Sequence, residues 1–169
     1  MLRYLPLIVL LALTAGCTGS FTRIAESEKT VHATAEVPGM SRERILSATR
    51  IWMEDNFVTQ ADPIAFEDRD EGSITGNGQI AYPCSWVGCL TKGDWNVSFA
   101  MRVDAQDGLI KTTFRNIQLA SPASGVNPVY SSGMNAPVWS RRDMEAIRPK
   151  LLELQRELVN DLLANAAGQ

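Results

Sequence analysis

Residues 94–119 read DWNVSFAMRVDAQDGLIKTTFRNIQL, and they contain the clearest structural pattern in the chain. From Trp95 to Val103, large apolar residues alternate with smaller or polar ones. A period of two is typical of a strand with one buried and one exposed face. Asp107-Gly108 is a turn dipeptide that favours a tight hairpin, and Leu109–Leu119 supplies the returning strand. The stretch therefore predicts two antiparallel strands joined by a short turn.

A strand and a helix are predicted on the N-terminal side of this hairpin. Residues Thr30–Val37 alternate in the same way and end at Pro38-Gly39. Ser41 is a suitable cap for a helix that runs to about Asn56. In that helix Ile45, Ala48 and either Ile51 or Trp52 follow helical spacing, which predicts one buried face.

Two more strands are predicted before the hairpin, over Ile64–Asp68 and Ser73–Pro83, with a turn at residues 69–72. Gly76 and Gly78 share one face of the second strand. Two glycines on one face mark the close approach of a neighbouring group. Trp52 from the preceding helix is our candidate for that group.

After the hairpin, residues Ala120–Val138 form a long segment rich in Ser, Pro, Gly and Asn, which we interpret as a loop. Ser140 with Asp143 resembles a helix start. Pro149 cannot supply the N–H that a regular helix needs, so we expect a turn or two and then a main helix from Pro149 to about Ala164.

The predicted fold class is α+β. Strand, helix, four strands and helix follow one another (β-α-β-β-β-β-α). An antiparallel sheet of about five strands, with the helices packed on one face, accommodates this order. A chain of 169 residues suits one such domain, which we assign to residues 30–167.

The N-terminal residues have the three parts of a secretory signal: a positive charge at Arg3, a short apolar run and small residues before Cys17. The apolar run is too short for a transmembrane helix, which needs roughly 20 residues. Leu13-Thr14-Ala15-Gly16-Cys17 resembles the lipobox of bacterial lipoproteins. The alternative is an ordinary secretory signal with an incidental cysteine.

The lipobox resemblance implies that residues 1–16 are a lipoprotein signal peptide and that Cys17 carries the lipid, including a fatty acyl chain such as palmitate. Residues 17–29 would then be a flexible tether. Thr18-Gly19-Ser20 lacks the Asp that retains enterobacterial lipoproteins in the inner membrane. We therefore expect a protein of the cell envelope, anchored to the outer membrane and facing the periplasm.

Cys84 and Cys89 remain once Cys17 is lipidated, an even number in an oxidising compartment. Their four-residue gap is not the two-residue gap of redox or zinc motifs. We expect a disulfide that pins the tip of a loop. As an alternative role, the bridge would present Trp86 and Val87 as a rigid apolar tip.

One family resemblance covers about half of the chain, from Val31 to Leu119. It is carried by four stretches in order: VPGM at 37–40, Trp52 with Asn56-Phe57, EGSITGNG at 71–78, and Val103-Asp104 with Asp107-Gly108. This pattern is similar to the domain of unknown function 4468, which implies a fold like that of the TATA-binding protein. Its members are commonly exported or lipid-anchored. The family has no assigned activity, and the resemblance brings no site residues with it.

No catalytic motif accompanies this fold, so we expect a protein that is not an enzyme and needs no cofactor or metal. His32 is the only histidine, and we interpret it as a solvated or hydrogen-bonded strand residue. The acidic turn at Asp68, Asp70 and Glu71 lacks the spacing of a calcium loop. The formal net charge is −3, so the chain lacks the excess of basic residues that is typical of nucleic-acid-binding proteins.

Two functional hypotheses remain. The first is a membrane-anchored structural or interaction module whose partner is another envelope protein. Its candidate contact residues are Trp86, Val87, Tyr130, Met134 and Trp139. The alternative is a periplasmic small-ligand-binding protein or enzyme that uses a groove under residues 120–138.

Overall fold

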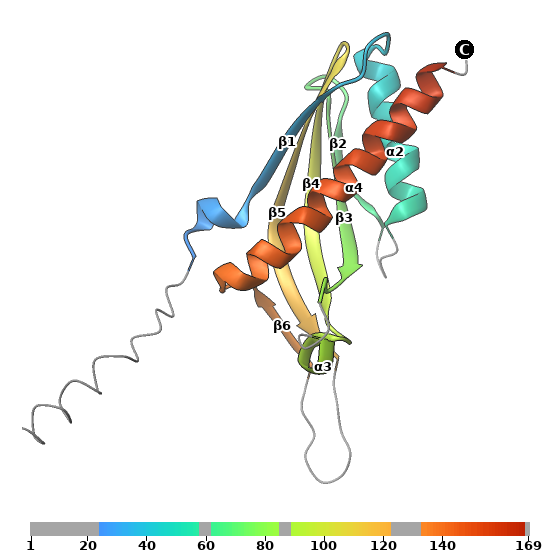
Figure 1. Cartoon of the computed structure of the whole chain (residues 1–169). Coiled ribbons are helices and arrows are strands. Elements are labelled where there is room, and N and C mark those ends of the chain that lie inside the picture. Colours follow the sequence, from blue (N-terminus) through green and yellow to red (C-terminus); the bar gives the residue numbers. More distant parts are fainter. Residues whose placement is uncertain (1–23, 58–61, 85–88, 123–132, 168–169) are drawn as a thin grey trace, which may run out of the picture.

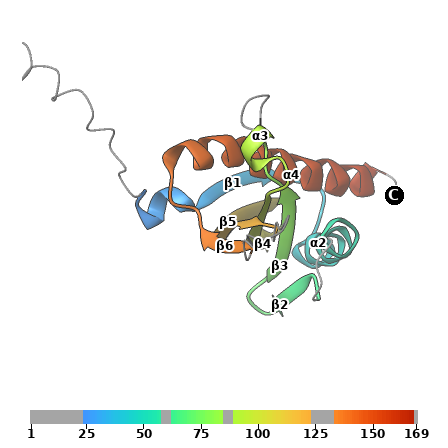
Figure 2. The same cartoon turned by 90° about the horizontal axis from the view of Figure 1, so that it is seen from below.

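The computed structural model describes residues 24–57, 62–84, 89–122 and 133–167. They form a six-stranded antiparallel sheet with two long helices on one of its faces (Figures 1 and 2), which confirms the predicted α+β class. The strands are β1 (Val31–Glu36), β2 (Ile64–Asp68), β3 (Ser73–Ala81), β4 (Asn96–Gln106), β5 (Leu109–Ser121) and β6 (Met134–Pro137). The helices are η2 (Glu26–Lys29), α2 (Arg42–Asn56), α3 (Cys89–Lys92) and α4 (Arg141–Ala167).

The strand order is β1-β5-β4-β3-β2, and every pairing is antiparallel. β4 and β5 lie at the centre, as the long hairpin through Asp107-Gly108 requires. β5 is long enough to pair with β1 over residues 109–114 and with β6 over residues 118–121. Its two partners therefore lie end to end along the same edge of β5.

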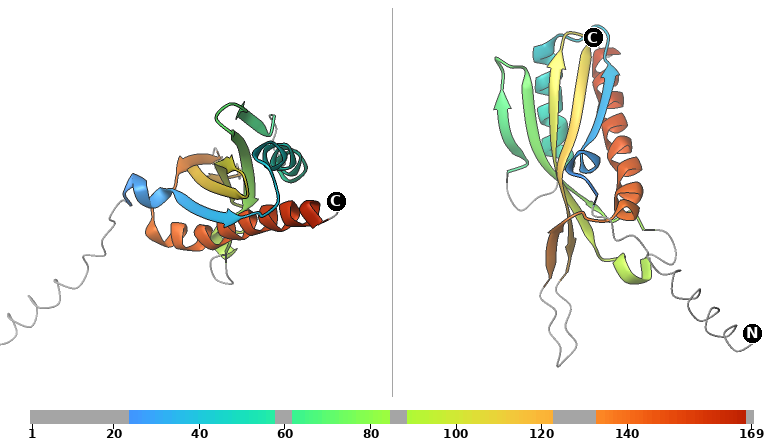
Figure 3. Two further views of the ribbon diagram at one scale, coloured as in Figure 1. Left: turned by 90° about the horizontal axis from the view of Figure 1, so that it is seen from above. Right: turned by 90° about the vertical axis from the view of Figure 1, so that its left-hand side faces the viewer.

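Apolar alternation in β4 decides which face of the sheet is buried. Val97, Phe99, Met101 and Val103 are all buried, whereas Arg102 and Asp104 are partly exposed. α2 packs on β3 and β4, and α4 packs on β1 and on α2. The right-hand view of Figure 3 shows the sheet in front of these helices.

Helix α2 begins and ends close to where the sequence predicts. The Ser41 side chain accepts a hydrogen bond from the Arg44 N–H at 3.4 Å, and Asn56 donates its side-chain N–H to the Trp52 carbonyl. Trp52, and not Ile51, lies in the buried face, because Ile51 is 58% exposed.

The two glycines of β3 do mark a close approach, but the prediction of Trp52 as the neighbour is wrong. A methyl group at Gly76 would come within 2.8 Å of the Met53 sulfur, and one at Gly78 within 2.6 Å of the Phe99 ring. Phe57 lies about 3.0 Å from both positions. Trp52 instead packs edge-on against Phe57, with ring centroids 5.6 Å apart.

Helix α4 corrects a second prediction, because it is continuous from Arg141 to Ala167 and contains Pro149 in its interior. Pro149 is exposed, so the backbone bond that it cannot make lies on the solvent side of the helix. Ile147 and Leu151, on either side of it, are fully buried. This packing keeps the helix continuous where a local rule predicts a new start.

Part of the segment predicted to be an unstructured loop, residues 120–138, is a strand. β6 pairs with the end of β5, and the Val138 N–H donates to the Ile117 carbonyl. A four-residue strand that contains Asn and Pro is too short to produce a recognisable period. Residues 123–132 lie outside the described residues, so the predicted groove beneath them stays a prediction.

Part of the predicted tether of residues 17–29 also belongs to the folded domain. Ile24 is buried, and its N–H donates to the Trp139 carbonyl at 3.5 Å. The Glu28 carboxylate forms an ion pair with the Arg141 guanidinium at 2.9 Å. The described fold therefore includes residues from Ile24 onward.

The packing at Gly78 is testable by one substitution. We expect Gly78→Ala to lower the free energy of unfolding by about 1–3 kcal/mol, because the added methyl group displaces the Phe99 ring. Urea denaturation followed by circular dichroism measures this change. Gln79→Ala, at the exposed neighbouring position, should change stability by less than about 0.5 kcal/mol. Equal stability of wild type and Gly78→Ala would contradict the packing described.

Candidate functional site

The two segments that the sequence singles out meet at one end of the sheet. Ala81 pairs with Asn96, Asn96 with Ala120, and Ala120 with Asn135. The cysteine segment leaves the sheet just after Ala81, and the segment after β5 leaves it just after Ser121. Figure 1 shows α3 and β6 at this common end. We call it the loop end and define it by Tyr82, Cys84, Cys89–Lys92, Trp95, Met134, Trp139 and Asp143.

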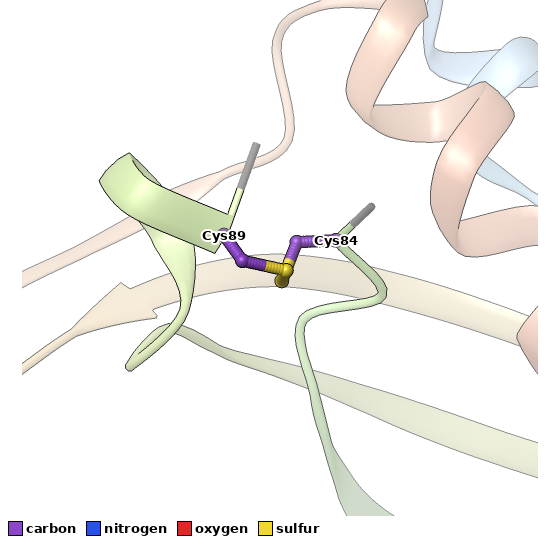
Figure 4. Close-up of a disulfide and its surroundings, with 2 residues drawn as sticks. All are labelled: Cys84 and Cys89. Carbon is purple, nitrogen blue, oxygen red and sulfur yellow. A yellow bond between two sulfur atoms is a disulfide. The ribbon is translucent and has the colours of Figure 1, made fainter. Parts of the chain in front are cut away.

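The disulfide between Cys84 and Cys89 is present, as predicted, with an S–S distance of 2.07 Å and a Cα–Cα distance of 5.1 Å (Figure 4). Cys84 follows the end of β3, and Cys89 begins the short helix α3. The bond therefore holds α3 against the end of the sheet. Trp86 and Val87, which the bridge is predicted to present, lie outside the described residues.

A buried carboxylate, Asp143, joins α4 to this end of the sheet. Its Oδ1 accepts hydrogen bonds from the Tyr82 hydroxyl at 2.6 Å and from the Lys92 ammonium at 2.5 Å. Its Oδ2 accepts from the Ser140 hydroxyl at 2.7 Å, and Ser140 in turn caps the Asp143 N–H at 3.0 Å. Both carboxylate oxygens are therefore engaged.

Lys92 is placed by aromatic rings as well as by the carboxylate. Its ammonium lies 4.9 Å from the centre of the Tyr82 ring and 5.0 Å from the centre of the Trp95 ring. Both distances are within the range of cation–π attraction. Because Lys92 ends α3, these contacts and the disulfide hold the same short helix at its two ends.

The protonation states of this cluster follow from its contacts. Burial alone would raise the pKa of Asp143, but hydrogen bonds from Lys92, Tyr82 and Ser140 outweigh it and hold that pKa below the ordinary value. Burial and the nearby Asp143 carboxylate both raise the pKa of Tyr82. An ionised Asp143 with occupied oxygens is a poor general base, and Tyr82 is a weak acid. The arrangement suits a structural brace better than proton transfer.

Sequence reasoning identified only the local part of this cluster. The spacing of Ser140 and Asp143 indicates a helix start, and the structure confirms the cap. Lys92 is 51 residues from Asp143 and Tyr82 is 61 residues away, so no local pattern connects them. The position of Asp143 in the first turn of a predicted helix gave no indication of these partners, because its burial depends on the tertiary structure.

Exposed apolar side chains accompany this brace. Leu90 of α3 is 85% exposed and Trp139 is 43% exposed, whereas Met134 of β6 is partly buried. Trp139 and Met134 are among the predicted contact residues, whereas Leu90 is not. Tyr130, a further predicted contact residue, lies outside the described residues.

The remaining polar candidates have structural contacts. His32 Nδ1 lies 3.1 Å from the Thr113 hydroxyl on the neighbouring strand. Asp68 accepts hydrogen bonds from the backbone N–H groups of Asp70 and Glu71, which closes the acidic turn.

Across the described ranges, no three His, Cys, Asp or Glu side chains are grouped to hold a metal ion. None of the described helices is both long and apolar enough to span a membrane.

Comparison with known protein families identifies the family to which this fold belongs. A family model described as a domain of unknown function (DUF4468) with TBP-like fold matches residues 32–120. The chain belongs to this family. The matched region spans β1 to β5, so β6 and α4 lie beyond it. It includes Tyr82 and Lys92 but not their partner Asp143.

Two solved structures share the DUF4468 fold. A DUF4468 family protein from Bacteroides ovatus is 17% identical, with a TM-score of 0.53, and the match covers 89% of this chain and 92% of that one. A TBP-like protein from Parabacteroides distasonis is 12% identical, with a TM-score of 0.58, covering 83% and 96%. At these identities the similarity shows the fold alone. No curated protein matches this chain.

The Asp143 brace predicts a specific dependence of stability on pH. We expect Asp143→Asn to lower the free energy of unfolding at pH 7 by about 1–3 kcal/mol, because a charge-assisted set of hydrogen bonds is lost. Since the folded-state pKa of Asp143 lies below its unfolded value, the carboxylate stabilises the fold above that value. This contribution disappears as the pH falls through the folded-state pKa.

The difference between wild type and Asp143→Asn should therefore shrink as the pH falls below about 4. Urea unfolding at a series of pH values measures it. Asp161→Asn, on the exposed side of the same helix, serves as the control and should change stability by less than about 0.5 kcal/mol at any pH. A difference that grows with acidity would contradict the assigned protonation state.

Proposed function

We propose that this DUF4468 protein is a lipid-anchored, non-catalytic interaction module of the bacterial cell envelope, and that it contacts a protein partner through the loop end. The observation that supports this most directly is the combination of exposed apolar side chains with a braced backbone. Leu90 is 85% exposed on a helix of four residues. Such a helix would not form by itself in water.

The bracing of α3 makes Leu90 a suitable anchor for a partner. The disulfide fixes Cys89, and the Asp143 carboxylate with two aromatic rings fixes Lys92. A side chain whose backbone is already ordered loses little conformational entropy on binding, so more of the contact energy contributes to affinity. Trp139 adds a large side chain of a type that often dominates binding energy at interfaces.

The anchor is the second part of the proposal. The sequence LTAGC at 13–17 supports cleavage before Cys17 and lipidation of that residue. A lipid at Cys17 would leave only a few residues before Ile24, where the described fold begins. A domain attached in this way stays near the membrane surface, and it meets partners at a high effective concentration.

Metabolic labelling tests the anchor. Cells that express the wild-type chain should incorporate radiolabelled palmitate into a membrane-associated band, because acylation follows the lipobox cysteine. Cys17→Ala should remove the label and leave a soluble or unprocessed chain. Cys84→Ala is the matched control and should retain the label, since Cys84 is bonded to Cys89. Equal labelling of wild type and Cys17→Ala would refute the lipid anchor.

Site-specific crosslinking tests the contact surface. A photo-crosslinking amino acid at Leu90 should give a discrete adduct of higher mass in intact cells, because this position is exposed at the loop end. The same group at Gln106, exposed at the opposite end of β4, should not. Trp139→Ala should weaken the Leu90 adduct while the domain stays folded. Adducts of equal yield at Leu90 and Gln106 would contradict a contact at the loop end.

A further inference from the structure

The sheet face opposite the helices contains a depression lined mainly by carboxamide side chains. It has a volume of about 290 Å³ and lies over residues 77–79 of β3, 98–100 of β4 and 116–118 of β5. Asn77 and Gln79 come from β3, and Asn116 and Gln118 from β5. Ser98 and Ala100 of β4 lie between these two pairs in the sheet, where they supply a floor of small side chains.

An irregularity in β5 creates this arrangement. The pairing of β4 with β5 shifts between Ser98 and Ala100, so Asn116 and Ile117 together lie opposite Phe99. Asn116 has a φ of +54°, a left-handed conformation that non-glycine residues adopt rarely. Asn tolerates this conformation better than most residues, but glycine would be free of strain there. The chain thus keeps a carboxamide at a position where backbone geometry favours glycine.

Bulges in strands frequently re-aim a side chain at a functional position, and local backbone strain is often found at such sites. Here the strained residue is one of four carboxamides that line a single depression. The backbone strain at Asn116 is a second observation, and it does not depend on the presence of the depression.

The chemistry of the lining indicates the class of ligand. Each carboxamide offers two N–H donors and one carbonyl acceptor, and the Ser98 hydroxyl can do both. No ionisable side chain lines the depression, so the lining favours a neutral ligand. Its volume is at the low end of ligand pockets, which begin at roughly 300 Å³. A pyranose ring fits this description, because its hydroxyl groups donate and accept hydrogen bonds around the whole edge of a compact ring.

We propose that this depression on the open face of the sheet is a binding site for a neutral saccharide, held by Asn77, Gln79, Asn116 and Gln118. The site lies on β3, β4 and β5 and uses none of the loop-end residues. Saccharide binding therefore does not depend on the proposed partner contact, and either can fail without the other.

The test uses the full-length chain, labelled with ¹⁵N and purified in a zwitterionic detergent that has no sugar headgroup. Maltotriose and N-acetylated chitotriose are added at millimolar concentrations, and binding is followed by saturation-transfer difference NMR. At least one trisaccharide should receive saturation from the protein. The side-chain NH₂ resonances of Gln79 and Gln118 should shift, whereas that of Gln106, at the far end of β4, should not.

Asn116→Gly is the decisive variant, because it keeps the backbone conformation and removes only the carboxamide. Its thermal midpoint should equal or exceed that of wild type, while its affinity for the trisaccharide should fall about tenfold. Gln106→Ala, which removes an exposed carboxamide elsewhere, should bind as wild type does.

Three results would overturn the proposal. The first is an absence of saturation transfer to both trisaccharides. The second is unchanged affinity in Asn116→Gly, which would show that Asn116 serves only the bulge. The third is a stronger response of the same NH₂ resonances to a neutral capped trialanine peptide, which would assign the depression to extended peptides.

Discussion

The contact between the rings of Phe57 and Phe99 and the bare backbone of Gly78 determines how the rest of the molecule is arranged. A methyl group at Gly76 would clash with Met53 and Phe57, and one at Gly78 would clash with Phe99 and Phe57. With glycine there, a series of edge-on aromatic pairs runs from Trp52 through Phe57 and Phe99 to Phe114, with centroids 5.6, 5.8 and 5.6 Å apart. The series joins α2 to both central strands, β4 and β5. Such pairs favour one geometry over others that bury the same area.

The second organising contact lies at the other long helix and is polar. Asp143 is nearly inaccessible to solvent, and an isolated charge in that position would destabilise the fold. Hydrogen bonds from Tyr82, Lys92 and Ser140 compensate for its burial. Two of these partners belong to the region matched by the DUF4468 model, whereas Asp143 does not. The brace therefore adds a charged contact to the apolar packing that holds α4 on β1 and α2.

These two contacts leave different surfaces available for function. Aromatic packing on the helix face frees the opposite face of the sheet, where the carboxamide depression lies. The Asp143 brace and the disulfide order the loop end, where Leu90 and Trp139 are exposed. In both places an ordered backbone holds side chains that are wholly or partly exposed.

Much of the fold could be predicted from local patterns. Alternation in β4 reports a half-buried strand because successive side chains point to opposite faces, and Asp107-Gly108 specifies the hairpin. The cap at Ser41 placed the start of α2, and the spacing of Cys84 and Cys89 indicated their disulfide. Each of these signals involves residues that are only a few positions apart, so it can be recognised in a single sequence.

What the sequence could not reveal depends on groups that are distant along the chain. The glycines of β3 indicated a close neighbour but not whether Trp52 or Phe57 would fill the space, since that depends on how α2 is rotated on the sheet. The continuity of α4 through Pro149 depends on burial of residues on both sides of the proline. Likewise Lys92 contacts Asp143, and Asn116 and Asn77 line one depression, only because the sheet and α4 bring separate segments together. The sequence by itself determined strands β1 to β5, the caps at Ser41 and Ser140 and the disulfide, because their signals are local. Tertiary packing decided β6 and which side chains share a site, because these depend on residues far apart in the chain.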